Sequence, residues 1–481
     1  MKKIFLLLLA VSFITISCDD MLNITPSTSW SGLNFPTEET HLDGLLYGGY
    51  EQMQNALASG FLYYGEMRAD VFYINAFNVT NDKIVNNKLE YGMSQASWAG
   101  FYQIIKQANL VLEYTPKLLE KNKTTEAKAN QLMGEAYCMR ALSYFYIIRT
   151  WGDAPLVKKP FLTKDDLKSL SRDPVDTILV TIHDDLDKGS KLIPSNKVTR
   201  TEFTRAAAYT IDAHVYAWEH NYEKVIEKAD KVLENTEYSL ASLYDPNLDI
   251  NAANFVANVQ STAYAQIFNV GKTKESIFEL AFSIQDGDDS RRLSSFFTSS
   301  WPYLRPHNNY CDSFDPLDWR AIVANKYNTT GKYTTIKFTI GFNMVEDSRN
   351  IVLYRLADLY LLKAEALANI GDTDDNRKNA MKLVNDIRRR AGGTSMEITE
   401  EVFLDRNTYP YEAFKDLILE ERKFELCYEG HRWFDLIRCG KAVEILKNRV
   451  NIDLDPAALV WPIYIEEIRR SPNIEQNEYY K

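Results

Sequence analysis

The sequence predicts a mainly α-helical protein in which helix pairs stack into a superhelix, with an irregular, partly β region inserted in its second half. Three observations support this fold class. Apolar residues recur with helical periodicity through both ends of the chain, two segments read as two helices joined by a tight turn, and the periodicity is lost between residues 240 and 345.

The first 17 residues have the pattern of a secretory signal peptide. Lys2 and Lys3 precede an apolar run that extends to Ile14, and the whole segment is too short to span a bilayer. The junction before Cys18 is similar to a bacterial lipobox, in which the cysteine is acylated after cleavage, although Thr15 stands where leucine is usual. The alternative is an ordinary secreted protein that is cut near residue 17.

We expect an acylated Cys18 to attach the mature chain to a membrane, because several acyl chains anchor a protein firmly where one binds only marginally. The polar stretch at 23–31 is typical of a tether, and no later apolar run reaches the roughly 18 residues that a crossing requires. The predicted organisation is therefore a signal peptide, a tether and one body, at 1–17, 18–37 and 38–481. Within that body we expect a helical scaffold at about 38–239 and 346–481 and a loop-rich insertion at about 240–345.

The charge of the chain argues against nucleic acid as a partner. The formal net charge is −11, and loss of the two leader lysines makes it −13. A surface of that sign repels phosphate backbones. The cysteines after residue 18 form no CxxC motif, so they predict neither a zinc site nor a disulfide framework, and Cys138 and Cys427 read as buried free thiols.

Amphipathic helices are expected in order along the chain. Their ranges are 38–58, 97–119, 125–150, 174–192, 203–219, 222–235, 351–370, 374–391, 411–428 and 431–447.

Two of these regions are helix pairs with short connections, at 204–235 and 354–393. Small residues in the first let a second helix approach, and Gly371 and Gly392 end the two helices of the second. Such pairs resemble tetratricopeptide units, although their spacing is irregular. Stacked pairs of this kind bury a continuous core.

Between the helix pairs, the chain is rich in Asn, Asp, Ser and Tyr. Two pieces of it are strand-like, 276–284 and 333–340, and the second roughly alternates. A long segment without regular secondary structure inside a packed protein more often has a function than serves only as a connection. We therefore look for a binding site in this insertion.

The segment 417–442, LILEERKFELCYEGHRWFDLIRCGKA, concentrates charge among apolar residues. A helix there places Glu421 and Glu425 on one face, and Gly430 suits a left-handed stop. His431 has only Asp435 one turn away, which is too few ligands for a metal. Acids and arginines mixed with core aromatics are usually ion pairs that fix helix packing, and we prefer that interpretation to a catalytic one.

This same segment resembles the C-terminal hallmark of the SusD/RagB family, which reads close to ERxxELxFEGxRxxDLxRxG. The stretch GEAYCMRALSYFYIIRTWGDAPLV at 134–157, the pair of motifs in 354–393, and VWPIYIEEIRRSPNIEQNEYY at 460–480 are similar to further family segments. Asp358 stands where the family usually has glutamate, and Ser471 and Glu478 also depart from its pattern. These departures concern helix detail and the C-terminal turn.

The resemblance implies a non-catalytic lipoprotein at the outer membrane, facing the cell exterior. Members of the family generally bind oligosaccharide on an aromatic platform and sit as a lid on a SusC-like TonB-dependent transporter. The hallmark then identifies the scaffold and not the ligand site. By this comparison we expect a tetratricopeptide-like fold, a glycan ligand and no cofactor.

The candidate platform residues come from the irregular parts of the chain. The first group is Trp301, Tyr303, Tyr310 and Trp319 with the polar residues Arg305, Asn308 and Asn309, in a loop broken by prolines. Tyr73 and Trp98 are further candidates. Pyranose rings have apolar faces that lie on aromatic rings, and their hydroxyls need polar partners. The alternative for each of these aromatics is a place in the core, which Tyr and Trp line more often than they form binding platforms.

Three alternatives remain open from the residues alone. A RagB-like peptide receptor would share the same scaffold. A glycoside hydrolase would need two carboxylates about 5–10 Å apart, and Asp286, Asp288 and Asp289 neighbour the aromatic stretch, although these acids could as easily hold calcium. The third alternative is a helical-repeat scaffold that recruits other proteins.

Overall fold

The computed structural model describes residues 35–76, 78–161, 170–282, 296–297, 302–339 and 349–481. The fold is mainly helical with three small sheets, as the sequence predicts. Within these ranges, no helix is long and apolar enough to cross a membrane.

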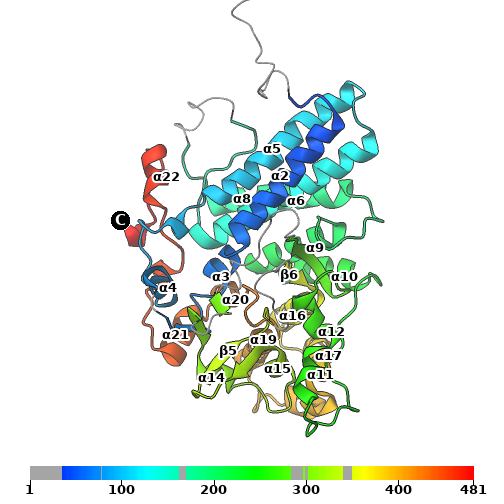
Figure 1. The fold of residues 1–481 in the computed structure, drawn as a ribbon, viewed down its shortest axis with the longest axis vertical. Helices are drawn as coiled ribbons and strands as arrows, with labels where there is room; N and C mark the ends of the chain where they lie inside the picture. The colour runs from blue at the N-terminus through cyan, green and yellow to red at the C-terminus, as the bar shows by residue number, and fades with distance from the viewer. Residues whose placement is uncertain (1–34, 77, 162–169, 283–295, 298–301, 340–348) are drawn as a thin grey trace, which may run out of the picture.

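Long helices from the first half of the chain pack side by side at one end of the molecule (Figure 1). They and the shorter helices between them are α2 (Glu39–Leu57), α3 (Gly60–Gly65), α4 (Val79–Val85), α5 (Ala99–Glu120), α6 (Glu126–Trp151), α8 (Val175–Leu192), α9 (Arg205–Trp218) and α10 (Tyr222–Leu233). Several start after a residue whose side chain accepts a free backbone N–H of the first turn, as Thr125 does from Lys128 in α6 and Thr204 from Ala207 in α9.

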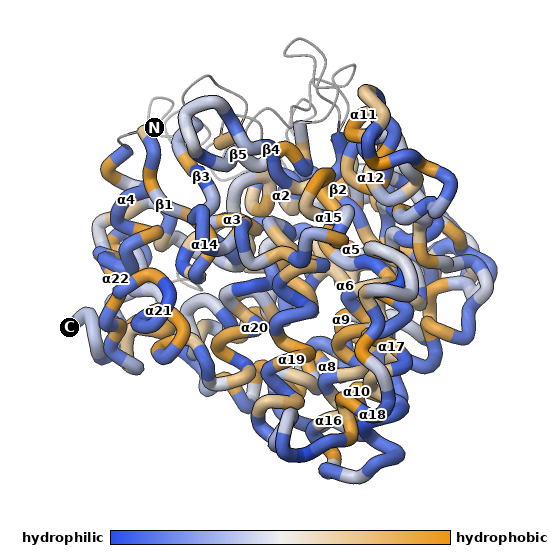
Figure 2. The backbone as a smooth tube through the Cα atoms, turned by 90° about the horizontal axis from the view of Figure 1, so that it is seen from below, coloured by the Kyte–Doolittle hydropathy of each residue, from blue (hydrophilic) through white to orange (hydrophobic). Residues whose placement is uncertain are grey.

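The second half of the chain adds a second group of helices. Most of them lie towards the opposite end in Figure 1, whereas the last helix lies at the level of the first group. They are α11 (Phe255–Gln260), α12 (Ala263–Asn269), α14 (Asn308–Cys311), α15 (Arg320–Ala324), α16 (Leu356–Asn369), α17 (Asp374–Gly392), α18 (Glu400–Leu404), α19 (Tyr411–Glu425), α20 (Arg432–Arg438), α21 (Ala442–Val450) and α22 (Ile465–Arg470). Along the tube of Figure 2, hydrophobic and hydrophilic residues alternate within the helices. Their apolar sides form the shared core.

The strands form three antiparallel pairs. They are β1 (Phe72–Ile74) with β3 (Leu304–Pro306), β2 (Ser276–Leu280) with β6 (Ile351–Arg355), and β4 (Asn325–Tyr327) with β5 (Tyr333–Thr335). Strands β3, β5 and β4 lie next to one another in Figure 2. The predicted strand segments contain β2 and β5, both shorter than expected.

Two helix predictions need correction. Residues 351–355 were expected to begin a helix but form β6, because β-branched Ile351 and Val352 are fully enclosed and pair with β2. The single helix expected at 431–447 is two helices, since the chain turns at Gly440, which has a positive φ of 67°.

The charged segment at 417–442 is structural, as predicted. Arg422 is buried and bridges Asp358 and Asp435, with N–O distances of 2.9 Å to each. Arg432 pairs with Asp70 at 2.9 Å, which ties α20 to the segment before β1. Gly430 has the expected positive φ, 80°. Cys138 and Cys427 are buried free thiols, also as expected.

Candidate functional site

A strand pair brings together candidate residues from distant parts of the sequence. Tyr73 on β1 lies opposite Arg305 on β3, and the backbone N–H of Asn75 donates to the carbonyl of Tyr303 at 3.0 Å. Side chains alternate between the two faces of a strand, so Tyr73, Tyr303, Arg305 and His307 share one face. We call these four residues the β1–β3 face.

The two tyrosines of the β1–β3 face remain accessible. The Tyr303 side chain is 39% exposed, and Tyr73 is half-buried with its ring centroid 5.4 Å from that of His307. Tyr73 and Tyr303 are diagonal neighbours across the pair, a relation that places two residues about 7–8 Å apart. Their spacing suits successive contacts along one extended ligand.

Arg305 lies directly opposite Tyr73 and joins the face to the β4–β5 strand pair (Asn325–Tyr327 with Tyr333–Thr335). Its Nη1 donates to the carbonyl of Tyr333 at 3.0 Å and to Oγ1 of Thr334 at 2.7 Å. The residue is only 7% exposed, and its Nε has no hydrogen-bond partner in the described part of the chain. The guanidinium is therefore held in place by neutral groups.

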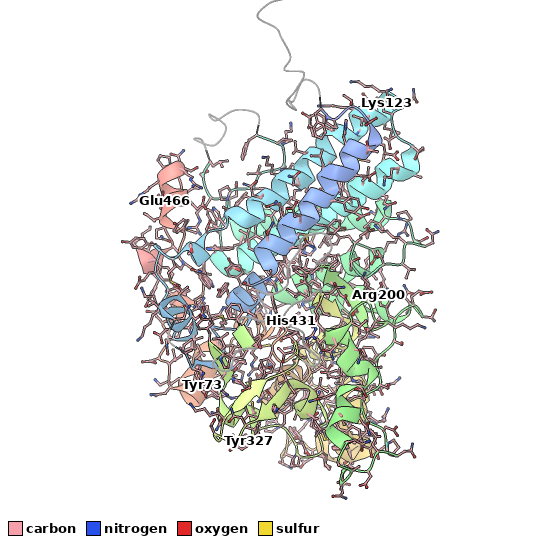
Figure 3. The ribbon with its side chains drawn as sticks, in the orientation of Figure 1. Tyr73, Lys123, Arg200, Tyr327, His431 and Glu466 are labelled. Carbon is pink, nitrogen blue, oxygen red and sulfur yellow. The ribbon has the colours of Figure 1, made fainter. Side chains whose placement is uncertain are left out.

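The β4–β5 hairpin beside the β1–β3 face carries two more tyrosines, Tyr327 and Tyr333. They are directly paired, their ring centroids are 4.8 Å apart, and Tyr327 is 61% exposed. The hydroxyl of Tyr333 donates to Asp312 at 2.8 Å, and burial together with that carboxylate raises the pKa of Tyr333 to about 12. Figure 3 shows Tyr73 and Tyr327 near the same edge of the molecule.

These hairpin tyrosines were not predicted as site residues. The signal available for them was the alternating pattern at 333–340, which indicated a strand but not its position beside β3. Lys332, in the turn of the hairpin, reaches back so that its Nζ lies 5.9 Å from the centroid of the Tyr73 ring.

A small hollow adjoins the β1–β3 face. It encloses about 70 Å³ and is lined by Ala69, Phe72, Tyr73, Ile74, Val85, Asn86, His307, Val450 and Ile452. A water molecule occupies roughly 30 Å³ of liquid, so the hollow suits a substituent and not a whole sugar ring. Burial lowers the pKa of His307, so at neutral pH its imidazole is uncharged and can both donate and accept a hydrogen bond.

Three predicted aromatics lie in the core and offer no open face to a ligand. Trp319 packs against Tyr244 with ring centroids 4.8 Å apart, and the Tyr310 hydroxyl donates to the carbonyl of Lys423 at 3.1 Å. Trp98 is 3% exposed. The physical reason is packing. A large aromatic ring next to the helical core is more stable inside it, because burial removes a large apolar area from water.

Asn308 and Asn309 are exposed at the start of α14. Their amides donate to the carbonyls of Gly331 at 3.1 Å and Arg449 at 3.3 Å, so they brace the β4–β5 turn and α21. Trp301, Cys18 and the acids at 286, 288 and 289 lie outside the described residues, and their roles stay predictions. Within the described ranges, no group of three or more His, Cys, Asp or Glu residues could hold a metal ion.

A larger hollow of about 130 Å³ lies where α10, α16, α19 and α20 meet, lined by residues that include His220, Tyr222 and Cys439. Its charges are already paired. Arg438 contacts Glu365 at 2.7 Å, Lys415 contacts Glu412 at 2.6 Å and Lys441 contacts Asp416 at 2.9 Å. The β1–β3 face is the stronger candidate because its cation, Arg305, is paired with no carboxylate among the described residues.

Comparisons with known proteins agree with this architecture. Residues 283–480 match the family model described as the SusD family, and residues 20–217 match one described as starch-binding associating with outer membrane. SusD-like protein P38 of Formosa agariphila is 26% identical over an alignment 524 residues long, gaps included. The alignment covers 99% of this chain and 98% of that protein.

Solved structures share the fold. A SusD superfamily protein of Bacteroides thetaiotaomicron superposes with a TM-score of 0.74 at 21% identity, over 92% of this chain and 99% of the other. A structure described as a laminarin-binding SusD-like protein gives a TM-score of 0.73 at 21% identity. The match covers 92% of this chain and 100% of the other.

Proposed function

The chain belongs to the SusD/RagB family of non-catalytic, glycan-binding proteins of polysaccharide utilisation systems, and we propose that it captures oligosaccharides and delivers them to a SusC-like TonB-dependent transporter. The observation that carries this proposal is the β1–β3 face. It sets two accessible tyrosine rings beside fixed polar groups on a rigid helical body.

The energetics of such a face suit reversible capture. A ring that covers ~100 Å² of a sugar, at ~25 cal/mol/Å², contributes at most about 2.5 kcal/mol before ordering costs. Two or three rings then give complexes with dissociation constants in the roughly micromolar to millimolar range. Weak binding favours hand-over to a transporter.

A glycan ligand is supported over a peptide by the relatives. One matched family is described as starch-binding and one structural relative as laminarin-binding. A peptide ligand would need rows of backbone donors and acceptors, whereas the β1–β3 face offers rings with single polar groups between them.

The protein is associated with the outer membrane. We propose that acyl chains on Cys18 provide the attachment and that the body faces the cell exterior. The leader pattern and the polar tether at 23–31 support this arrangement.

Replacement of Tyr303 by alanine tests the proposed site. We expect binding of the preferred oligosaccharide, identified on a glycan array and titrated by calorimetry, to weaken by about tenfold or more, because one stacking surface is lost. Tyr47→Ala is the matched control, since Tyr47 is a 56% exposed tyrosine on α2. Equal affinities of all three proteins, or binding only on a peptide array, would refute the assignment.

A further inference from the structure

We propose that the β1–β3 face selects glycans that carry an anionic substituent, either a carboxylate or a sulfate ester, and that Arg305 and Lys332 recognise that group. This substrate class rests on the proposed function of the same face. It follows from how charge is distributed around the face.

Arg305 is a buried cation whose partners are all uncharged. Its described hydrogen bonds go to a backbone carbonyl and a threonine hydroxyl, and no carboxylate among the described residues pairs with it. Arg68 and Arg200 are likewise buried with only uncharged described partners, but they lie outside the β1–β3 face. Other buried arginines are paired with acids. Arg320 pairs with Asp318 and Glu421 at 2.7 Å each, and Arg140 pairs with Asp185 at 2.7 Å. An uncompensated buried charge is costly, so an anion that reaches Arg305 gains a favourable partner.

Lys332 adds a second uncompensated charge at the same place. Its ammonium lies over the ring of Tyr73 and, within the part of the chain that the structure describes, forms no ion pair. Of the neighbouring acids, Asp70 is held by Arg432 and Arg449 at 2.9 Å each, and Asp312 accepts from the Tyr333 hydroxyl and forms no ion pair with Lys332.

The result is a cationic spot on an acidic protein. The whole chain has a formal net charge of −11, yet Arg305 on the face and Lys332 beside it form no ion pair with any described carboxylate. Because Lys332 Nζ lies 5.9 Å from the centroid of the Tyr73 ring, a substituent of a sugar that contacts Tyr73 comes within reach of this ammonium. Charge-assisted hydrogen bonds to carboxylates and sulfate-like groups are roughly twice as strong as neutral ones.

The test compares glycans that differ only in charge. Calorimetric titrations of the mature protein would use oligogalacturonate and its methyl ester as one pair, and a sulfated laminarin oligosaccharide and its unsulfated parent as the other. We expect the anionic member of at least one pair to bind about tenfold more tightly. The two pairs distinguish a carboxylate from a sulfate ester as the recognised group.

Variants then locate the recognition. Lys332→Gln should lose most of the preference for the anionic member, and Lys332→Arg should keep it. Lys123→Gln is the matched control, because Lys123 is an exposed lysine at the far end of the molecule (Figure 3) and the change removes the same charge. Arg305 is left intact in these experiments, since its Nη1 fixes the β4–β5 hairpin.

Two results would overturn this inference alone: equal binding of both members of each pair, or a preference that survives in Lys332→Gln as in Lys123→Gln. In either case neutral glycans would still bind, and the proposed function would stand. If neither charged nor neutral glycans bind the wild-type protein, the proposed function itself fails as well.

Discussion

Buried ion pairs are the residue-scale feature that holds the helices in register. Arg140 on α6 donates from Nε and Nη2 to both oxygens of Asp185 on α8, each at 2.7 Å. Burial raises the pKa of Asp185 even though Arg140 opposes that shift. Such a pair contributes little net energy when complete, but a single remaining partner is strongly destabilising.

Arg140→Met should therefore lower the free energy of unfolding by about 3–5 kcal/mol, because Asp185 is left buried without a cation. Urea denaturation followed by circular dichroism measures the change. The double variant Arg140→Met/Asp185→Leu should be more stable than the single variant, since both charges are then absent.

The surface pair Arg389–Glu397 provides the control. Its N–O distance is 2.6 Å, but the Arg389 side chain is 50% exposed. Arg389→Met should cost less than about 1 kcal/mol. A double variant at 140 and 185 no more stable than Arg140→Met would show that the buried charge is not the cause.

Residue-scale packing also explains which candidate aromatics are accessible. Tyr303 and Trp319 are both in proline-broken sequence, and composition does not separate them. In the structure Trp319 packs against Tyr244 in the core, whereas Tyr303, just before β3, is 39% exposed. Strand alternation could have grouped Tyr303, Arg305 and His307 from the sequence, but only pairing with β1 adds Tyr73.

At the scale of elements, small residues let the long helices approach closely. Gly189 on α8 faces α6, and a Cβ there would lie 2.4 Å from Sγ of Cys138 and 3.0 Å from the carbonyl oxygen of Gly134. The close α6–α8 contact thus depends on the absence of a side chain at this position.

Gly189→Ala should destabilise the protein by about 1–3 kcal/mol, because the added methyl group forces the two helices apart. Thermal and urea unfolding both measure this effect. Gly44→Ala on α2 is the control, since a Cβ there meets nothing within 4 Å. That change should be neutral or slightly stabilising, by up to about 1 kcal/mol. Equal loss at both positions would contradict the packing explanation.

The element predictions succeeded where helices are long and amphipathic and failed where segments are short. Helices α5, α6, α8 and α17 lie within a residue or two of their predicted ranges. Strand β6 was taken for helix because five apolar-rich residues are compatible with either structure until a partner strand is known.

At the scale of the whole molecule, the proposed lipid anchor and the β1–β3 face divide attachment and ligand binding between two different parts of the chain. The tether at 18–37 would hold the body at the membrane, and the body would present the face to passing polymer. The face itself joins residues more than 200 positions apart, since Tyr73 lies opposite Arg305.

Cys18→Ala should abolish lipid attachment. Cells grown with radioactive palmitate should incorporate label into the wild-type protein and not into the variant, which should leave the membrane fraction, because each buried acyl CH₂ contributes roughly 0.8 kcal/mol to membrane binding. Cys439→Ala should keep both label and membrane attachment, as it changes a partly exposed cysteine of the body. Label retained in Cys18→Ala would place the anchor elsewhere.

The sequence by itself determined the helical class, the order of the long helices, the structural role of the charged segment and the family. These follow from periodicity and local motifs, which extend over a few neighbouring residues and can therefore be recognised in the sequence alone. Only the tertiary structure decided which aromatics are open, which cations lack a carboxylate and how Tyr73, Arg305 and Lys332 meet. Those properties depend on contacts between distant segments, and burial or pairing of a side chain is set by its neighbours in space.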